Sequence, residues 1–148
     1  MSISSRFSVG IHILTLLGTN TSVVKSSELI AGSVNTNPVV IRKIMGMLKT
    51  AGLVNVRPGI AGATLAKDLS EITLLDVYKA VNVVQEKELF SVHENPNPAC
   101  LVGRNIQSTI ITIFSKAQQA LETELENVTL KDVILDLNKK DELQNSKS

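Results

Sequence analysis

Residues that build metal centres and catalytic sites are scarce in this sequence. Its 148 residues include one cysteine, Cys100, and two histidines, His12 and His93. A single cysteine excludes a disulfide within the chain and any zinc or iron–sulfur site made from several cysteines of one chain. Two histidines leave little from which to build a catalytic acid–base pair. We therefore expect no metal and no other cofactor.

Long apolar runs and nucleotide-binding loops are also absent. A membrane-spanning helix needs roughly 18 or more apolar residues in succession, and no stretch approaches that length. The N-terminus lacks the charged segment followed by an apolar core that marks a signal peptide. The sequence has no Gly-rich phosphate loop and no nucleophile pattern. We expect a cytoplasmic protein that does not contact a membrane and is not an enzyme.

The charged residues are distributed unevenly, although the formal net charge is only +1. Residues 1–67 contain seven Lys and Arg against one acidic residue, Glu28, which gives +6. Residues 68–148 contain eight basic and thirteen acidic residues, which gives −5. This split suggests that one end of the chain meets a polyanion and the other meets protein. With 43% apolar residues, the chain can bury one core without disulfides.

Apolar periodicity and serine caps predict two helices in the first part of the chain. The first should begin after an N-cap at Ser4 or Ser5 and end at Gly18. The second should begin after an N-cap at Ser26 or Ser27 and run for about two turns.

The strongest helix signal follows Asn37 and Pro38. Asparagine is a good N-cap, and proline suits the first helical position because its missing N–H has no partner there. The residues that follow divide into two faces with helical spacing. The apolar face comprises Ile41, Ile44, Met45 and Leu48, and the opposite face comprises Arg42, Lys43, Gly46 and Lys49. We expect this helix to bury one side and to present the other.

A β-hairpin is predicted next. Residues 53–57 and 63–66 have the alternation and β-branching of short strands. Pro58-Gly59 with Gly62 supplies the turn between them. Such a hairpin after three helices is the wing of a winged helix-turn-helix unit.

A fourth helix completes this unit. Thr73 and Asp76 are spaced as a capping box with Asp in place of Glu, and they open a helix that extends to Val81. We therefore predict a mostly α fold in which residues 1–81 form a winged helix-turn-helix DNA-binding domain with a β-hairpin wing.

The rest of the chain is interpreted as a linker, a long C-terminal dimerisation helix and a tail. Residues 82–102 lack clean periodicity and contain two Asn-Pro pairs, so we expect a sensor-type linker loop. From Gly103 one helical stripe comprises Ile106, Ile110, Ile113, Phe114, Ala117, Leu121 and Leu125. Such a stripe is wider than one small domain can cover, so we predict a homodimer through residues 103–137. Residues 138–148 are polar and should be a disordered tail.

A last helix is predicted inside the dimerisation region. Thr129 and Asp132 repeat the capping-box spacing. The side chains expected to be buried there are Leu130, Val133, Ile134 and Leu137.

The third helix and the wing supply residues suited to double-stranded DNA. The set expected to enter the major groove is Asn37, Val39, Val40, Arg42 and Lys43. Arg42 can make a bidentate contact to guanine, whereas Lys25 and Lys49 are better placed for phosphates. Arg57 at the wing can enter an adjacent minor groove, and Gly59 permits close approach. The alternatives are a solvated basic surface and a winged-helix protein-interaction module without specific DNA binding, and the charge split favours DNA.

The sequence resembles a known family over roughly residues 1 to 137. The segments that carry the resemblance are Ile44–Val54, Arg57-Pro58-Gly59 with Gly62, Leu65–Lys67 and Glu71–Val77. Together they resemble the Rrf-two family of bacterial winged helix-turn-helix transcriptional regulators, which includes IscR, NsrR and CymR. The resemblance implies a DNA-binding regulator that dimerises through the long helix and carries its signal-sensing residues in the linker. It also implies that Arg57 enters the minor groove. Our leading hypothesis is that this regulator is a repressor.

The linker departs from the cluster-binding members of that family. Those members carry three cysteines there, and this chain has only Cys100, so an iron–sulfur cluster held in the family manner is not expected. Cys100 is a candidate redox switch because it lies just before a helix N-terminus, which favours a thiolate. The alternative is a small buried packing residue. A metal site from His93, Glu94 and Cys100 is a weaker pattern without helical spacing.

Overall fold

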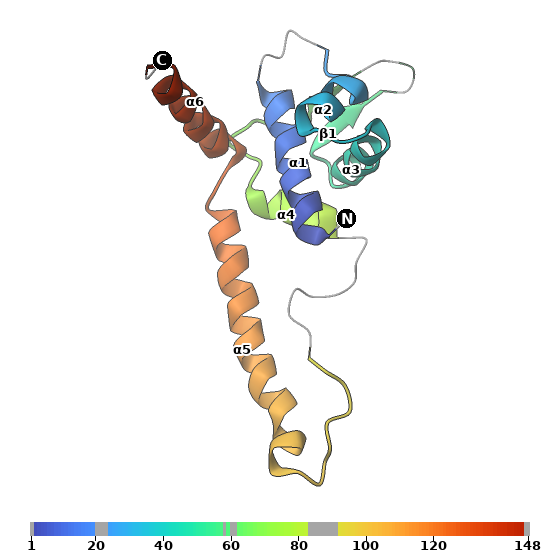
Figure 1. The fold of residues 1–148 in the computed structure, drawn as a ribbon, viewed down its shortest axis with the longest axis vertical. Helices are drawn as coiled ribbons and strands as arrows, with labels where there is room; N and C mark the ends of the chain where they lie inside the picture. The colour runs from blue at the N-terminus through green and yellow to red at the C-terminus, as the bar shows by residue number, and fades with distance from the viewer. Residues whose placement is uncertain (1, 20–23, 58, 60–61, 83–91, 147–148) are drawn as a thin grey trace.

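A computed structural model describes the chain except for residues 1, 20–23, 58, 60–61, 83–91 and 147–148. The elements are α1 (Ile3–Gly18), α2 (Ser27–Val34), α3 (Pro38–Thr50), β1 (Val54–Val56), β2 (Ala63–Leu65), α4 (Leu74–Asn82), α5 (Leu101–Glu126) and α6 (Leu130–Ser146). Three helices, a two-stranded hairpin and a fourth helix form a winged body, and the long helix α5 follows it (Figure 1). The predicted fold class is confirmed.

Side-chain caps begin the first three helices. The hydroxyl of Ser26 accepts a hydrogen bond from the N–H of Leu29, and Oδ1 of Asn37 accepts one from the N–H of Val40. The predicted cap of α1 at Ser4 or Ser5 is wrong, because Ser2 is the N-cap and its hydroxyl accepts from the N–H of Ser5. Serine is tolerated inside a first turn, so a run of serines does not determine which of them caps.

The core lies beneath α3. α3 packs against α1, α2, α4 and β1. Its buried side chains are Ile41, Ile44 and Leu48, and they meet Ile13 and Leu14 of α1 in one hydrophobic cluster. β1 and β2 pair antiparallel with Val54 opposite Leu65. Because close-packed interiors are rigid, this cluster fixes the orientation of α3 and of the hairpin beside it.

α4 and α6 begin side by side. Thr73 and Thr129 form an antiparallel bridge, and each makes the reciprocal capping hydrogen bonds predicted for it, to Asp76 and Asp132 respectively. Leu130 is fully buried against the winged body. Leu137, which the sequence predicted to be buried, is 48% exposed. α6 extends away from the body after its first turns (Figure 1), and two of its other leucines, Leu135 and Leu143, are more than half exposed.

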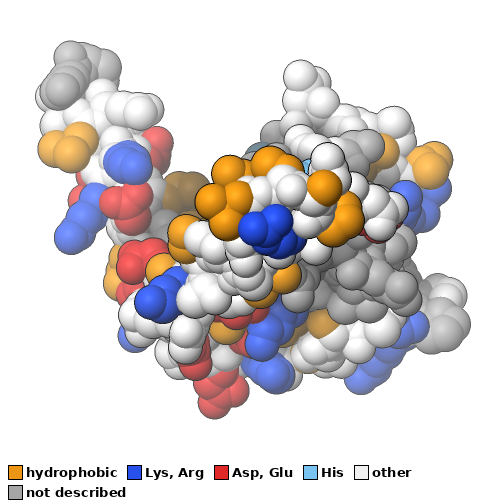
Figure 2. Space-filling model, turned by 90° about the horizontal axis from the view of Figure 1, so that it is seen from below, with side chains coloured by type: hydrophobic (Ala, Val, Ile, Leu, Met, Phe, Trp, Pro, Cys, Tyr) orange, Lys and Arg blue, Asp and Glu red, His pale blue; other side chains and the backbone are white. Residues whose placement is uncertain are grey.

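α5 stands apart from the winged body along most of its length (Figure 1). It begins at Leu101 rather than at Gly103, with Cys100 as its N-cap residue, and none of its side chains is buried within the single chain. The end of the molecule where α5 begins exposes hydrophobic side chains (Figure 2), and Leu101 and Val102 are both more than half exposed. Among the helices described, none is long and apolar enough to cross a membrane.

The predicted disorder of residues 138–148 is wrong for most of that segment. α6 continues as one helix to Ser146. The segment is polar but contains strong helix formers such as Leu, Lys, Glu and Gln, and Lys140 pairs with Asp136 one turn earlier at 2.9 Å. Low hydropathy therefore excludes burial of this segment but not helix formation.

Candidate nucleic-acid interface

α3 exposes the basic face that the sequence predicted. Arg42, Lys43 and Lys49 are all exposed, while the residues between them on the other side of the helix are buried. The cap by Asn37 fixes the first turn, and Pro38 occupies the first helical position. The result is a rigid helix with three cations on its solvent side.

The first turn of α3 presents two valines differently. Val39 is 69% exposed. Val40, predicted with Val39 to enter a DNA groove, is half-buried and packs against the hydrophobic core. Asn37 is exposed, but its side-chain oxygen Oδ1 accepts a hydrogen bond from the N–H of Val40. Val39 is therefore more available to a partner than Val40.

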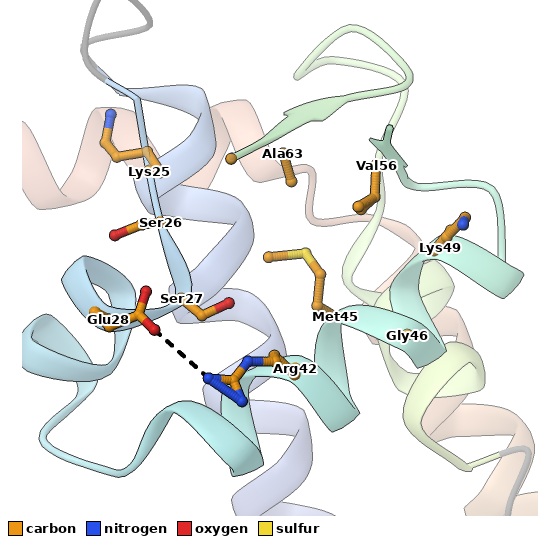
Figure 3. Close-up of a pocket in the computed structure, with 11 residues that line it drawn as sticks. Lys25, Ser26, Ser27, Glu28, Arg42, Met45, Gly46, Lys49, Val56 and Ala63 are labelled. Carbon is orange, nitrogen blue, oxygen red and sulfur yellow. Dashed lines mark ion pairs between the residues drawn. The ribbon is translucent and has the colours of Figure 1, made fainter. Parts of the chain in front are cut away.

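Arg42 makes an ion pair with Glu28 of α2. Nη2 of Arg42 lies 3.5 Å from Oε1 of Glu28, and both side chains are more than half exposed (Figure 3). An exposed pair of this kind contributes little to stability, typically about 0–1 kcal/mol. Its main effect is to place the guanidinium near the start of α2. Sequence reasoning missed this role of Glu28, although Glu28 is the one acidic residue of the basic half.

Lys25 does not have the position that the sequence predicted. Its side chain is only 8% exposed, and Nζ donates a hydrogen bond to the carbonyl oxygen of Thr19 at 3.0 Å. A lysine held in this way links the end of α1 to the segment before α2. Its assignment as a phosphate contact is therefore corrected to a structural one.

A hollow lies between α2, α3 and the hairpin (Figure 3). Its volume is about 440 Å³. The lining includes Ser26, Ser27 and Glu28 of the α2 start, Arg42, Met45, Gly46 and Lys49 of α3, and Val56 and Ala63 of the two strands. Sequence reasoning placed Arg42 and Lys49 on one helix face but did not predict this hollow, because it depends on how the hairpin packs beside α3.

The wing residues of the prediction lie at the end of the hairpin. Arg57 and Gly59 are both exposed, and Gly59 has a left-handed φ of 74°. Glycine adopts this conformation without strain. The expected turn residue Pro58 lies outside the described residues.

Cys100 is exposed at the start of α5. Its thiol makes no side-chain capping hydrogen bond, but the backbone N–H groups of Gly103 and, to a lesser extent, Val102 lower the pKa of Cys100 below its ordinary value. The alternative of a buried packing residue is wrong. His93, Glu94 and Cys100 do not form a metal-binding group, and neither does any other set of three such side chains in the described parts of the chain.

The stripe predicted for the dimer interface is incompletely buried in the single chain. Ile113 is 57% exposed and Ala117 is exposed. Its other members are half-buried, and they are Ile106, Ile110, Phe114, Leu121 and Leu125. The stripe is therefore only partly covered by the chain's own residues.

Comparison with known proteins assigns the chain to a family. The Rrf2 family model, described as an iron-dependent transcriptional regulator, matches residues 3–136. YwnA of Bacillus subtilis (strain 168), a candidate HTH-type transcriptional regulator, is 49% identical over 132 residues, which cover 89% of this chain and 96% of YwnA.

Two solved structures are similar in fold. One, of a candidate DNA-binding protein, has a TM-score of 0.70 at 42% identity and covers 87% of this chain and 98% of that one. CymR (YrzC), the global cysteine regulator of B. subtilis, has a TM-score of 0.61 at 22% identity, covering 90% of this chain and 96% of CymR. Because the family model matches most of the chain and YwnA shares almost half of its residues, this chain belongs to the Rrf2 family of transcriptional regulators.

Proposed function

We propose that this protein is a homodimeric repressor that binds a specific double-stranded DNA operator. The observation that carries the proposal is the basic, exposed face of α3 on a rigid core, with an exposed arginine on the adjacent hairpin. This is the arrangement in which a recognition helix enters the major groove and a wing reaches the neighbouring minor groove. The relatives are regulators, which supports a binding protein rather than an enzyme.

The exposed cations have two proposed roles. Some contact the edges of the bases, and others contact the phosphate backbone of the DNA. Arg42 exchanges Glu28 for the O6 and N7 atoms of a guanine, and Lys43 and Val39 face the bases beside it. Lys49, two turns further along α3, contacts phosphate. Arg57 enters the minor groove, where narrow A·T-rich sequence concentrates negative potential.

Dimerisation brings two such units to one operator. The partly uncovered stripe of α5 packs against the same stripe of a second chain, as a twofold interface requires. The two recognition helices then bind two half-sites whose centres are about one turn of the DNA helix, or a multiple of it, apart. The acidic second half of the chain keeps this dimer surface away from DNA.

Regulation is proposed to act through Cys100. The thiol is exposed, its pKa is lowered, and it sits where the linker meets α5. Oxidation or alkylation there alters the first turn of α5 and so the spacing of the recognition helices. A small change in spacing costs affinity because half-site separation is fixed by DNA geometry.

Selection of genomic fragments by the purified full chain tests the proposal. We expect enrichment of a twofold-symmetric site, including one upstream of its own gene, and protection of that site in footprinting. Arg42→Ala should enrich sites in which one base pair per half-site is no longer selected, and Arg57→Ala should enrich A·T-flanked sites less than the wild type does. Lys140→Ala on α6 should enrich the same sites as the wild type. A protein that enriches no duplex under any salt condition would instead be a winged-helix protein-interaction module.

A further inference from the structure

The hollow between α3 and the hairpin carries net positive charge. Arg42 and Lys49 line it with exposed cations against one carboxylate, Glu28, which is paired with Arg42. Lys25 also lines the hollow, but its ammonium is bonded to the carbonyl oxygen of Thr19. The exposed Lys49 lies on the same side of α3 as Gly46 (Figure 3). An anion that enters the hollow therefore meets the ammonium group of Lys49 next to Gly46, where α3 has no side chain.

Gly46 is not explained by the packing of the protein. It lies inside α3, its φ is not left-handed, and a Cβ built on it would meet nothing within 4 Å. Glycine in an exposed helix interior weakens the helix relative to alanine because it gains more freedom in the unfolded chain. The fold would tolerate a side chain at this position and would be more stable with one.

Three other helical glycines are explained by close neighbours. A Cβ on Gly10 would lie 3.1 Å from Cγ1 of Val77, and one on Gly18 would lie 2.6 Å from Cδ2 of Leu69. A Cβ on Gly103 would collide with the backbone carbonyl of Asn97. Gly32 of α2 shares the open surroundings of Gly46, but Gly32 is not among the residues that line the hollow.

We propose that the hollow seats one sugar-phosphate strand of the operator, which lies directly on α3 at Gly46 with a phosphate neutralised by Lys49. This inference rests on the proposed function and adds the place where the strand passes between the recognition helix and the wing. Because Gly46 has no side chain, the sugar-phosphate backbone of the DNA can approach α3 closely. The ammonium of Lys49 then binds a phosphate and replaces a condensed counterion. Arg42, held by Glu28 at the edge of the hollow, is left to read bases.

The shape and charge of the site favour a DNA strand over a free small molecule. A volume of about 440 Å³ also fits small ligands. However, the walls are the recognition helix and the two strands of the wing, which straddle a strand of the duplex when they occupy adjacent grooves. The exposed Lys49 is therefore on the path that the phosphates must follow, and Arg42 lies at the edge of that path.

The test compares Gly46→Ala with the matched control Gly32→Ala. Both variants should unfold at a higher urea concentration than the wild type, because both remove a glycine from an exposed helix. Gly46→Ala should bind the operator and a non-specific duplex at least about fivefold more weakly, since the added Cβ displaces the strand from α3. Gly32→Ala should bind both duplexes as the wild type does.

Replacing the operator phosphates one at a time with neutral methylphosphonates identifies the phosphate that Lys49 contacts. Replacement of that phosphate in each half-site should weaken operator binding by the wild type. The same replacement should not weaken binding by Lys49→Gln any further. Equal duplex binding by Gly46→Ala and the wild type would overturn this inference alone, as would a loss of stability in Gly46→Ala. Absence of duplex binding by the wild type would instead overturn the proposed function.

Discussion

Thr73 and Thr129 form an antiparallel bridge that joins the start of α4 to the start of α6. The N–H of Leu74 donates to the carbonyl of Val128 at 2.9 Å, and the N–H of Leu130 donates to the carbonyl of Ile72 at 2.8 Å. Each threonine also belongs to its own capping box. The C-terminal end of α5 is thereby fastened to the winged body, so the direction of the long helix is set relative to α3 at this junction.

Removing one of these caps should destabilise the fold. Thr129→Ala deletes the hydroxyl that accepts the N–H of Asp132, and the loss of such a cap costs about 1 kcal/mol. Urea unfolding followed by circular dichroism measures the change. Thr123→Ala, at an exposed position of α5, is the control and should change stability by less than about 0.5 kcal/mol. An equal effect of the two substitutions would mean that the Thr129 cap does not hold α6.

Loss of the Arg42 side chain should relax sequence preference at one base pair of each half-site. A bidentate arginine–guanine contact accounts for about 1–3 kcal/mol of discrimination against other bases. We expect Arg42→Ala to bind the operator and its single-base variants at that position with similar affinities, in a competition assay. Lys116→Ala, on exposed α5, should retain the wild-type preference. Undiminished discrimination in Arg42→Ala would assign base reading to another residue.

A charge placed on the uncovered stripe should produce monomers. Ile113 is 57% exposed in the single chain, so Ile113→Glu leaves the fold of one chain intact while burying a carboxylate in any α5–α5 interface. Sedimentation should show a dimeric wild type and a monomeric variant at micromolar concentration. Leu143→Glu, at a position of α6 that is 61% exposed, should remain dimeric. A monomeric wild type, or a dimeric Ile113→Glu, would contradict dimerisation through this face.

The thiol of Cys100 should react at lower pH than an ordinary cysteine. The N–H groups of Gly103 and Val102 favour its thiolate, so the pKa is lowered and more of the reactive form is present at neutral pH. The rate of iodoacetamide alkylation against pH should therefore rise with a midpoint below that of the same protein unfolded in urea. Coincident midpoints for folded and unfolded protein would show that the start of α5 does not activate the thiol.

Local signals in the sequence were sufficient for much of the fold. Asn37-Pro38 and the two Thr-x-x-Asp boxes predict helix starts because a cap and its partner are only a few residues apart. The pairing of Thr73 with Thr129 could not be predicted, because it depends on where α5 returns the chain. Low hydropathy does not predict the continuation of α6 to Ser146, because a polar segment can be helical without being buried.

The candidate site was predictable to the extent that it lies on one helix. Arg42, Lys43 and Lys49 share a face of α3 by spacing alone. The burial of Lys25 and the pairing of Arg42 with Glu28 depend on contacts between separate segments, and no periodicity encodes them. The same holds for the hollow beside Gly46, which exists only where α2, α3 and the hairpin meet.

The most direct test of the account is the salt dependence of binding to an operator-containing duplex and to a scrambled duplex of equal length. We predict that the logarithm of the affinity for both falls linearly with the logarithm of the salt concentration, because Lys and Arg side chains displace condensed counterions. The operator should stay at least about 10³-fold tighter at physiological salt, and Lys49→Gln should reduce the slope by about one. Binding that is insensitive to salt, or equal for the two duplexes, would contradict a sequence-specific DNA-binding function.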